Sequence, residues 1–197
     1  SLKIAIHFDT GMSRLGLDKN ETKLILESKE KYINFSNVVL VMSHLACADT
    51  PSKKKNSHQL ENFCKIIKYF PNTKHSLANS AGILLGKKYH FDMVRPGISL
   101  YGGNPLKNSK NIYDNVINLK AKIIQVRNIS KNDTIGYGAT FKAKKNMIIG
   151  TVPLGYADGF SRLFSNNFEG YVGHQKISIV GRVSMDLILS LIHISEP

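Results

Sequence analysis

The sequence of 197 residues predicts an α/β fold in its first half and an all-β fold in its second half. Across residues 1–105, short apolar runs ending in polar turns alternate with segments of helical spacing, which is typical of parallel strands joined by helices. Over residues 116–188, apolar and polar residues alternate at period two between Gly and Asn, as in antiparallel strands. The polar residues 106–115 are expected to form a linker between the two domains.

In the first half, the apolar runs and the helical segments follow one another in order. We expect strands at 2–8, 38–42, 73–78 and 93–94, and helices at 19–31, 57–69 and 80–86. The second helix rests on Leu60, Phe63 and Ile67, which recur at helical spacing. Folds of parallel βα units carry their chemistry at the carboxyl ends of the strands, so the residues that follow each strand are the candidates for a site.

The β-domain is predicted from three period-two runs, at 121–126, 147–153 and 176–183. The last nine residues, 189–197, break this pattern, and their sequence Leu-Ser-Leu-Ile-His-Ile-Ser-Glu-Pro resembles the translation of a DNA-library adapter. We therefore expect this tail to be non-native and leave it out of the predicted fold. The alternative is an ordinary final strand.

Composition and charge exclude several classes of protein. Lys and Arg exceed Asp and Glu by 27 − 14 = 13, but 22 of the 27 are Lys in runs such as 53–55, which favours a solvated face over nucleic-acid binding. No apolar run approaches the about 20 residues that cross a bilayer, so we expect no membrane partner. Cys47 and Cys64 form no C-x-x-C pair and suit a reducing compartment, so we expect a cytoplasmic protein without a metal site.

Polar residues follow the predicted strands and are the candidate site residues. Arg14, His44, Ser80 and Arg95 all stand at such positions, and each of the five Arg in this Lys-rich chain is a candidate for contacts that need a planar fork of donors. Taken singly, the segment around Arg14 could be a turn that caps a helix, and His44 could be a buried histidine without chemistry. Together they lie where a parallel βα fold keeps its active site.

Two of the turns together predict a phosphate site. Ser80 offers a hydroxyl at the start of a helix, Gly97 lets a ligand approach the backbone, and Ile98 supplies a further amide. An anion would be held there without a lysine. The alternative is a plain helix cap at Ser80 and a simple turn at Gly97.

Seven motifs in one order make the sequence recognisable. They are DTGMSRLG (9–16), SHLACAD (43–49), LANSAGIL (77–84), MVRPGISLYGG (93–103), IGYGATF (135–141), PLGYADGF (153–160) and GRVSMD (181–186). In order and spacing they resemble the bacterial alanine racemase family over about residues 3–188. The resemblance implies part of a TIM-type (β/α)8 barrel that binds pyridoxal 5′-phosphate (PLP), followed by most of a β-domain. It also implies that the chain is a fragment, inactive alone, since it lacks the strand whose lysine binds the cofactor.

The resemblance assigns the cofactor contacts to residues at the strand ends. Arg95 would face the pyridine nitrogen, and because a guanidinium cannot accept a proton, that nitrogen would stay unprotonated and the ring would be a weak electron sink. His44 would pack beside the ring and link Arg95 to the catalytic tyrosine. Ser80, Gly97 and Ile98 would hold the phosphate.

The resemblance assigns proton transfer and substrate binding as well. Tyr137 matches the catalytic tyrosine, one of two bases on opposite faces of the α-carbon, and the missing lysine is the other. A free phenol titrates near pH ~10, so this role needs cationic neighbours, which Arg14 and the His44–Arg95 pair would supply. Arg14 and the Met185 amide would receive the substrate carboxylate. Other positions match or neighbour the substrate entrance: Tyr156, Asp49, Arg162, Arg182 and Asp186. Arg182 and Asp186 could instead form a surface ion pair.

Two positions depart from the family pattern. His7 stands where many members have a carbamylated lysine that positions the arginine equivalent to Arg14, so Arg14 must be held in another way. Ser76 stands where a supporting histidine is common, with His75 one place away. Both departures concern residues behind the site.

The resemblance implies a PLP-dependent racemase that interconverts L- and D-alanine and supplies D-alanine for peptidoglycan. It also implies a homodimer in which the β-domain of one subunit covers the barrel mouth of the other. The alternatives are a broad-specificity amino-acid racemase and a non-catalytic PLP-binding barrel protein, which lacks a β-domain. A basic β-domain that binds nucleic acid is the remaining alternative, and a steep salt dependence would be its signature.

Overall fold

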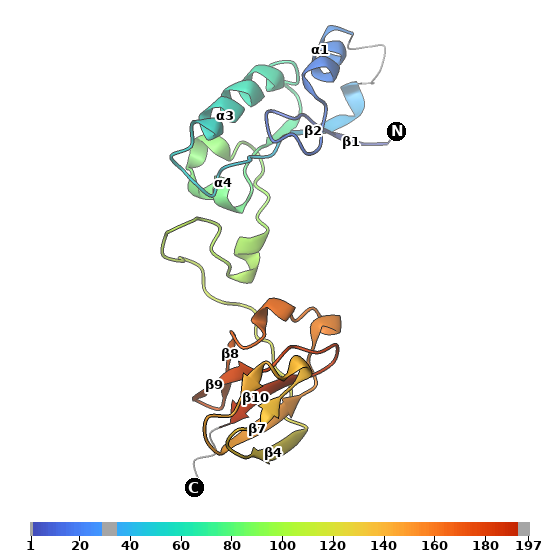
Figure 1. The fold of residues 1–197 in the computed structure, drawn as a ribbon. Coiled ribbons are helices and arrows are strands. Elements are labelled where there is room, and N and C mark those ends of the chain that lie inside the picture. The colour runs from blue at the N-terminus through green and yellow to red at the C-terminus, as the bar shows by residue number, and fades with distance from the viewer. Residues whose placement is uncertain (1, 29–34, 193–197) are drawn as a thin grey trace. The chain divides into compact units, whose positions relative to one another are not determined.

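The computed structural model describes residues 2–28 and 35–192. Two compact units make up the chain, residues 1–118 and 119–197, and Figure 1 labels several elements of each. The domain boundaries expected from the sequence, at 105 and 116, stay predictions.

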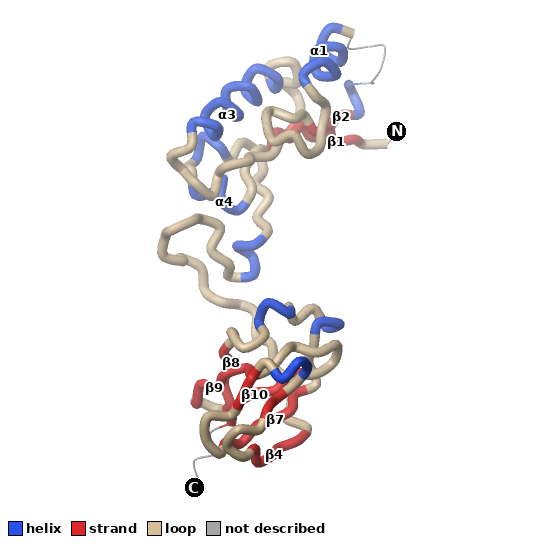
Figure 2. Tube along the Cα trace, in the orientation of Figure 1, coloured by secondary structure: helices blue, strands red, loops and turns tan. Residues whose placement is uncertain are grey.

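A three-stranded parallel sheet with helices forms the first unit (Figure 2). Its strands are β1 (Ile4–His7), β2 (Val38–Met42) and β3 (Lys74–Ser76), in that order across the sheet, and its helices are α1 (Lys19–Glu27), α3 (Lys54–Ile67) and α4 (Ser80–Leu84). The alternation of strand and helix predicted for the first half is confirmed. Of the first predicted helix, residues 29–31 lie outside the described residues. The described residues also form short 3-10 turns in both units: η1 (Phe35–Asn37), η2 (Lys87–Tyr89), η3 (Ile98–Tyr101), η4 (Tyr137–Ala139), η5 (Tyr156–Asp158) and η6 (Arg162–Phe164).

The fourth strand, expected at residues 93–94, is wrong. This part of the chain forms only an isolated bridge between Asn79 and Arg95. The N–H groups of Asp92 and Met93 both donate to the carbonyl of His75, so the regular ladder does not continue. Pro96 follows and has no N–H with which to extend it.

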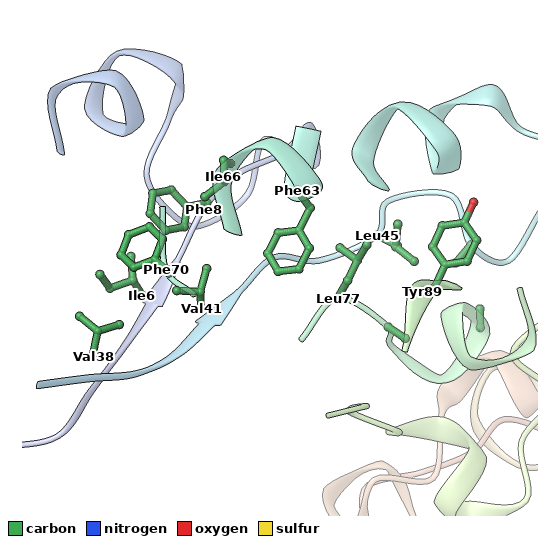
Figure 3. Packing of buried hydrophobic residues seen from close by; sticks show 13 residues of the cluster. Ile6, Phe8, Val38, Val41, Leu45, Phe63, Ile66, Phe70, Leu77 and Tyr89 are labelled. Carbon is green, nitrogen blue, oxygen red and sulfur yellow. The ribbon is translucent and has the colours of Figure 1, made fainter. Parts of the chain in front are cut away.

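The core of the first unit lies between the sheet and α3 (Figure 3). Phe8, Val41, Phe63 and Leu77 have no exposed surface, and burial of each contributes about 1.5–3 kcal/mol relative to an exposed position. The rings of Phe8 and Phe70 lie 5.7 Å apart between centroids, which ties the end of β1 to the segment after α3. This packing fixes the strand ends that carry the candidate residues. Within the described residues, no helix is long and apolar enough to cross a membrane.

A five-stranded antiparallel sheet forms the second unit. Its order is β4 (Gln125–Ile129), β7 (Met147–Val152), β10 (Ile188–Ile192), β9 (Gln175–Val180) and β8 (Glu169–Val172), and a separate hairpin pairs β5 (Thr134–Ile135) with β6 (Phe141–Lys142). The predicted all-β character is confirmed. The strands expected at 147–153 and 176–183 correspond to β7 and β9, whereas the one expected at 121–126 forms later, as β4.

The strand β10 corrects the expectation that the fold ends at residue 188. Residues 188–192 pair with β7 along their full length, and Leu189 and Ser190 also pair with β9. Alternate residues of this strand, Ile188, Ser190 and Ile192, are buried. Residues 189–192 are therefore part of the sheet; the adapter origin of the segment stays a prediction, and residues 193–197 lie outside the described residues.

The segment expected as a linker, 106–115, is fastened to the first unit. The Lys107 backbone N–H donates to the Asp49 carbonyl at 2.9 Å, and the Lys107 ammonium lies 3.0 Å from the Asp49 carboxylate. The Asn111 side chain donates to the Gly102 carbonyl at 2.7 Å. The polar residues Lys107 and Asn111 of this segment thus bond to loops of the first unit.

Candidate active site

The loop after β1 carries Arg14 and is held by one carboxylate. Both oxygens of Asp9 accept backbone N–H bonds, from Gly11 at 2.8 Å and from Met12 and Ser13 at 2.7 Å. Burial raises the pKa of Asp9, but these three bonds outweigh it, and the net result is a pKa below the ordinary value. The carboxylate thereby fixes the backbone that leads into the exposed Arg14.

The His7 ring packs against the same loop at Gly16. Gly16 has a φ of +106°, and a Cβ there would lie 2.6 Å from Cδ2 of the His7 ring. The N–H of Leu17 donates to the His7 carbonyl at 2.8 Å, which closes the loop. Since no described residue forms a hydrogen bond or an ion pair with the Arg14 side chain, its position depends on this loop backbone.

A buried glutamine joins the loops after β1 and β2. Gln59 of α3 has no exposed surface; its oxygen accepts from the Ala46 N–H at 2.8 Å and its nitrogen donates to the His44 carbonyl at 2.9 Å. The same nitrogen lies 3.3 Å from the Thr10 hydroxyl, which shares a 2.7 Å hydrogen bond with the Ser43 hydroxyl. This network sets the backbone on both sides of His44.

The His44 ring is uncharged at neutral pH. Burial, followed by the positive charges of Arg14 and Arg95, lowers its pKa to about 4. Its Nε2 lies 3.2 Å from the Asn79 side-chain nitrogen. In the described residues no hydrogen bond joins His44 to Arg95. The pair was expected to supply positive charge for the role of Tyr137. Because the His44 ring is uncharged, only Arg95 of this pair carries a positive charge.

The Arg95 guanidinium is anchored by two neutral oxygens. One nitrogen donates to the Ser43 carbonyl at 2.5 Å, and the other donates to the Ser76 hydroxyl. Ser76 is fully buried, and its hydroxyl donates a hydrogen bond to the Met93 carbonyl at 2.6 Å. His75 does not take part in this anchor; its Nε2 lies 3.0 Å from the Phe70 carbonyl oxygen. Ser76 therefore takes the supporting position in which the family pattern has a histidine.

The turns at Ser80 and Gly97, expected to hold an anion, lie in contact with each other. The Ser80 hydroxyl oxygen accepts from the Gly97 N–H at 2.7 Å, which leaves its proton for a ligand, and no described acceptor takes the Ile98 N–H. A Cβ on Gly97 would meet only Ser80 Oγ, at 4.0 Å. An open space lined by a hydroxyl and a backbone amide fits the phosphate of a cofactor.

In the second unit, Tyr137 lies at the tip of a loop with left-handed backbone. Gly136 and Gly138 have φ values of +74° and +72°, and the Tyr137 side chain is 73% exposed. The Arg182 guanidinium lies beside Gly138, where a Cβ would be 3.5 Å from its central carbon. Arg182 therefore packs on the Tyr137 loop, and the ion pair with Asp186 is not formed among the described contacts.

Met185 and Tyr156 belong to one tightly packed pair of turns. The Tyr156 N–H donates to the Ser184 carbonyl at 3.0 Å, and a Cβ on Gly155 would fall 2.0 Å from the Met185 carbonyl oxygen. No described residue accepts a hydrogen bond from the Met185 N–H, so this amide is available to a carboxylate. Arg162 lies over the Tyr156 ring, 5.5 Å from its centroid.

The sequence-predicted residues thus gather in two sets. Arg14, His44, Asp49, Ser80, Arg95, Gly97 and Ile98 lie in the first unit, and Tyr137, Tyr156, Arg162, Arg182, Met185 and Asp186 lie in the second. Sequence reasoning missed Asp9, Gln59 and Ser43 as supports. A glutamine on the apolar face of a predicted helix was the one available signal, since such a face rarely buries an amide without a partner.

Comparison with known proteins gives relatives for both units. A family model described as "Alanine racemase, N-terminal domain" matches residues 1–105, and "Alanine racemase, C-terminal domain" matches residues 116–196. The alanine racemase of Rickettsia bellii is 45% identical over 184 residues, 93% of this chain and 45% of the relative. That of Rhodospirillum rubrum is 46% identical over 184 residues, 93% of this chain and 49% of the relative. The chain spans about half the length of the curated relatives it matches.

Solved structures show the same likeness. Alanine racemase from Bartonella henselae, solved with covalently bound pyridoxal phosphate, has a TM-score of 0.81 at 35% identity and covers 98% of this chain and 54% of that chain. The biosynthetic alanine racemase from Pseudomonas aeruginosa has a TM-score of 0.80 at 33% identity, with 96% and 53% covered. The fold is therefore part of an α/β barrel followed by a β-domain.

Proposed function

This chain belongs to the alanine racemase family, and from that premise we propose that the protein interconverts L-alanine and D-alanine with PLP as its cofactor. The observation that carries the proposal is the set of strand ends in the first unit. There an uncharged imidazole follows β2 and the Ser80 hydroxyl follows β3, and oxygens at the ends of these two neighbouring parallel strands anchor a guanidinium. Product D-alanine would serve peptidoglycan synthesis, and the two free cysteines favour a cytoplasmic enzyme.

The cofactor contacts follow from the free donors. Ser80 Oγ–H and the Ile98 N–H would hold the phosphate, with Gly97 leaving room for it. Arg95 would donate to the pyridine nitrogen and leave it unprotonated, because a guanidinium has no lone pair to accept a proton. When bound, PLP withdraws electrons from the α-carbon of the substrate and makes its hydrogen acidic.

The protein residues then bind the substrate and move the proton. Arg14 and the Met185 N–H would receive the carboxylate, and Tyr137 would exchange a proton with one face of the α-carbon. Five further residues would restrict the entrance of the site to substrates with small side chains. They are Tyr156, Arg162, which lies over the Tyr156 ring, Arg182, Asp49 and Asp186.

The proposal is tested by assaying the full-length protein, loaded with PLP, for conversion of L-alanine. We expect optical rotation to decay to zero and D-alanine to accumulate, with much slower turnover of leucine and lysine. Equal rates on bulky amino acids would support the broad-specificity racemase, and PLP binding without turnover would support the carrier protein.

We further propose a homodimer that shares its active sites. Tyr137 and Met185 of one subunit would then serve the Arg14, His44 and Arg95 of its partner, and a two-fold axis would make both sites equivalent. Consider full-length chains in which one carries Tyr137→Phe and the other lacks the cofactor lysine. A mixed dimer has one site with both defects and one site with neither, so activity should reappear after subunit exchange. With sites built from a single chain, verified exchange would restore nothing.

A further inference from the structure

The Asn79 side chain lies between the start of α4 and the His44 ring. Its oxygen accepts from the Gly82 N–H at 2.9 Å, which caps the helix. Its nitrogen lies 3.3 Å from the Leu45 carbonyl and 3.2 Å from His44 Nε2. The amide therefore contacts three groups with its two atoms.

The orientation of this amide is determined at both ends. A backbone N–H only donates, so the atom that faces Gly82 must be the oxygen of Asn79. A backbone carbonyl only accepts, so the atom that faces Leu45 must be the NH₂ group. Exchanging the two atoms would break both bonds, and this end of the amide is therefore a donor toward His44.

A donor at this place dictates where the imidazole proton sits. His44 Nε2 has to offer a lone pair to the Asn79 NH₂ group, and in a neutral imidazole the proton is then on Nδ1. We propose that Asn79 is a positioning residue that keeps His44 in the neutral, Nδ1-protonated form beside the cofactor. Protonation of Nε2 would turn two N–H groups toward each other.

The charged surroundings act in the same direction. Arg14 from the loop after β1 and Arg95 from the segment after α4 both disfavour a positive ring, and so does His7 on β1. Burial adds to this, because desolvation penalises the charged form. His44 would thus hold no proton on the nitrogen that Asn79 faces, and it would not compete with Tyr137 as a proton donor; this last consequence rests on the proposed function.

The tautomer is tested on the full-length, PLP-loaded protein labelled with ¹⁵N-histidine. Long-range ¹H–¹⁵N spectra distinguish a protonated from an unprotonated ring nitrogen, and the His44 signals are those lost in His44→Gln. We expect a single Nδ1–H form that persists from pH 8 down to about pH 5. A protonated Nε2 in the unmodified protein would overturn the proposal, whatever the variants do.

Asn79→Asp changes the donor into an acceptor with almost no change of shape. One carboxylate oxygen still caps Gly82, since Asp is as good a cap as Asn, and the other now faces Nε2. We expect the proton to move to Nε2 and the pKa of His44 to rise by about 1 to 3, because a carboxylate at this distance favours the charged ring. Racemisation should fall at least about tenfold in kcat, with KM for alanine little changed.

Asn79→Ser is the matched control. Serine keeps the cap but is too short to reach the ring, so it removes the donor without adding a charge. We expect both tautomers to appear and the pKa of His44 to rise less than in Asn79→Asp. If both variants keep a single Nδ1–H form, Asn79 does not set the tautomer. Because these spectra do not depend on turnover, a protein that fails to racemise alanine would refute the proposed function and leave the tautomer result standing.

Discussion

Tyr137→Phe should lower kcat for alanine racemisation by about 10²- to 10⁴-fold, the range that a positioned acid or base contributes. The substitution removes one hydroxyl from Tyr137, a residue that is 73% exposed, so the unfolding temperature should be unchanged. Exchange of the α-hydrogen with D₂O gives the sharper measurement. It should stop for one enantiomer of alanine and persist for the other, because in the proposed mechanism the second base would work on the opposite face.

Tyr171→Phe is the control for this experiment. Tyr171 lies on β8 and is 70% exposed, so it loses the same atom from a similarly solvated ring. Its kcat should stay within about twofold of the unmodified enzyme, as surface substitutions ordinarily do. Retention of activity in Tyr137→Phe, or equal loss of exchange for both enantiomers, would show that Tyr137 is not one of two face-selective bases.

Arg95→Glu should reduce racemisation by about 10²-fold or more and raise the formation of pyruvate from alanine. A carboxyl beside the pyridine nitrogen can share a proton with it, which makes the ring a stronger electron sink and favours transamination. The measurement is the ratio of D-alanine to pyruvate at equal L-alanine consumption. Pyruvate is detected with lactate dehydrogenase.

Arg95→Gln separates the effect of an acidic proton beside the ring nitrogen from the effect of losing the guanidinium contacts. Glutamine also gives up the guanidinium contacts to the Ser43 carbonyl and the Ser76 hydroxyl, but it has no acidic proton to share. We expect it to lose racemisation without gaining pyruvate. An unchanged product ratio in both variants would mean that Arg95 is not the partner of the ring nitrogen.

The elements that the sequence predicted well are those with strong local signals. β2 follows from the uninterrupted apolar run Val38–Met42, and α3 follows from Leu60, Phe63 and Ile67 at helical spacing. The strand at 93–94 failed because its pattern was too short to reveal that Asp92 and Met93 both bond to one carbonyl of β3. Pairing between segments far apart in sequence decides such cases, and periodicity does not report it.

The candidate site divides in the same way. A residue next to a strand end, such as His44 after β2, could be proposed as a candidate because the fold class makes such positions suitable for chemistry. The supporting residues could not: Gln59 reaches His44 from α3, and Ser76 reaches Arg95 from β3. These contacts depend on side-chain directions that only the folded chain defines. The contact between His44 and Asn79 could not be predicted either, because the two residues are 35 positions apart and meet only in the folded chain.

The anchor of Arg95 has a consequence for how the enzyme would respond to its surroundings. Its two acceptors, a serine hydroxyl and a backbone carbonyl, do not ionise, and the nearby His7 and His44 both have pKa values lowered by burial. A histidine at position 76 would have added a group that gains charge in mild acid. With serine there, ionisation of the Arg95 anchor would not alter the electric field at the pyridine nitrogen of a bound cofactor. Acidification would then slow the reaction through its two proton-transferring bases, while the choice between racemisation and transamination stayed fixed.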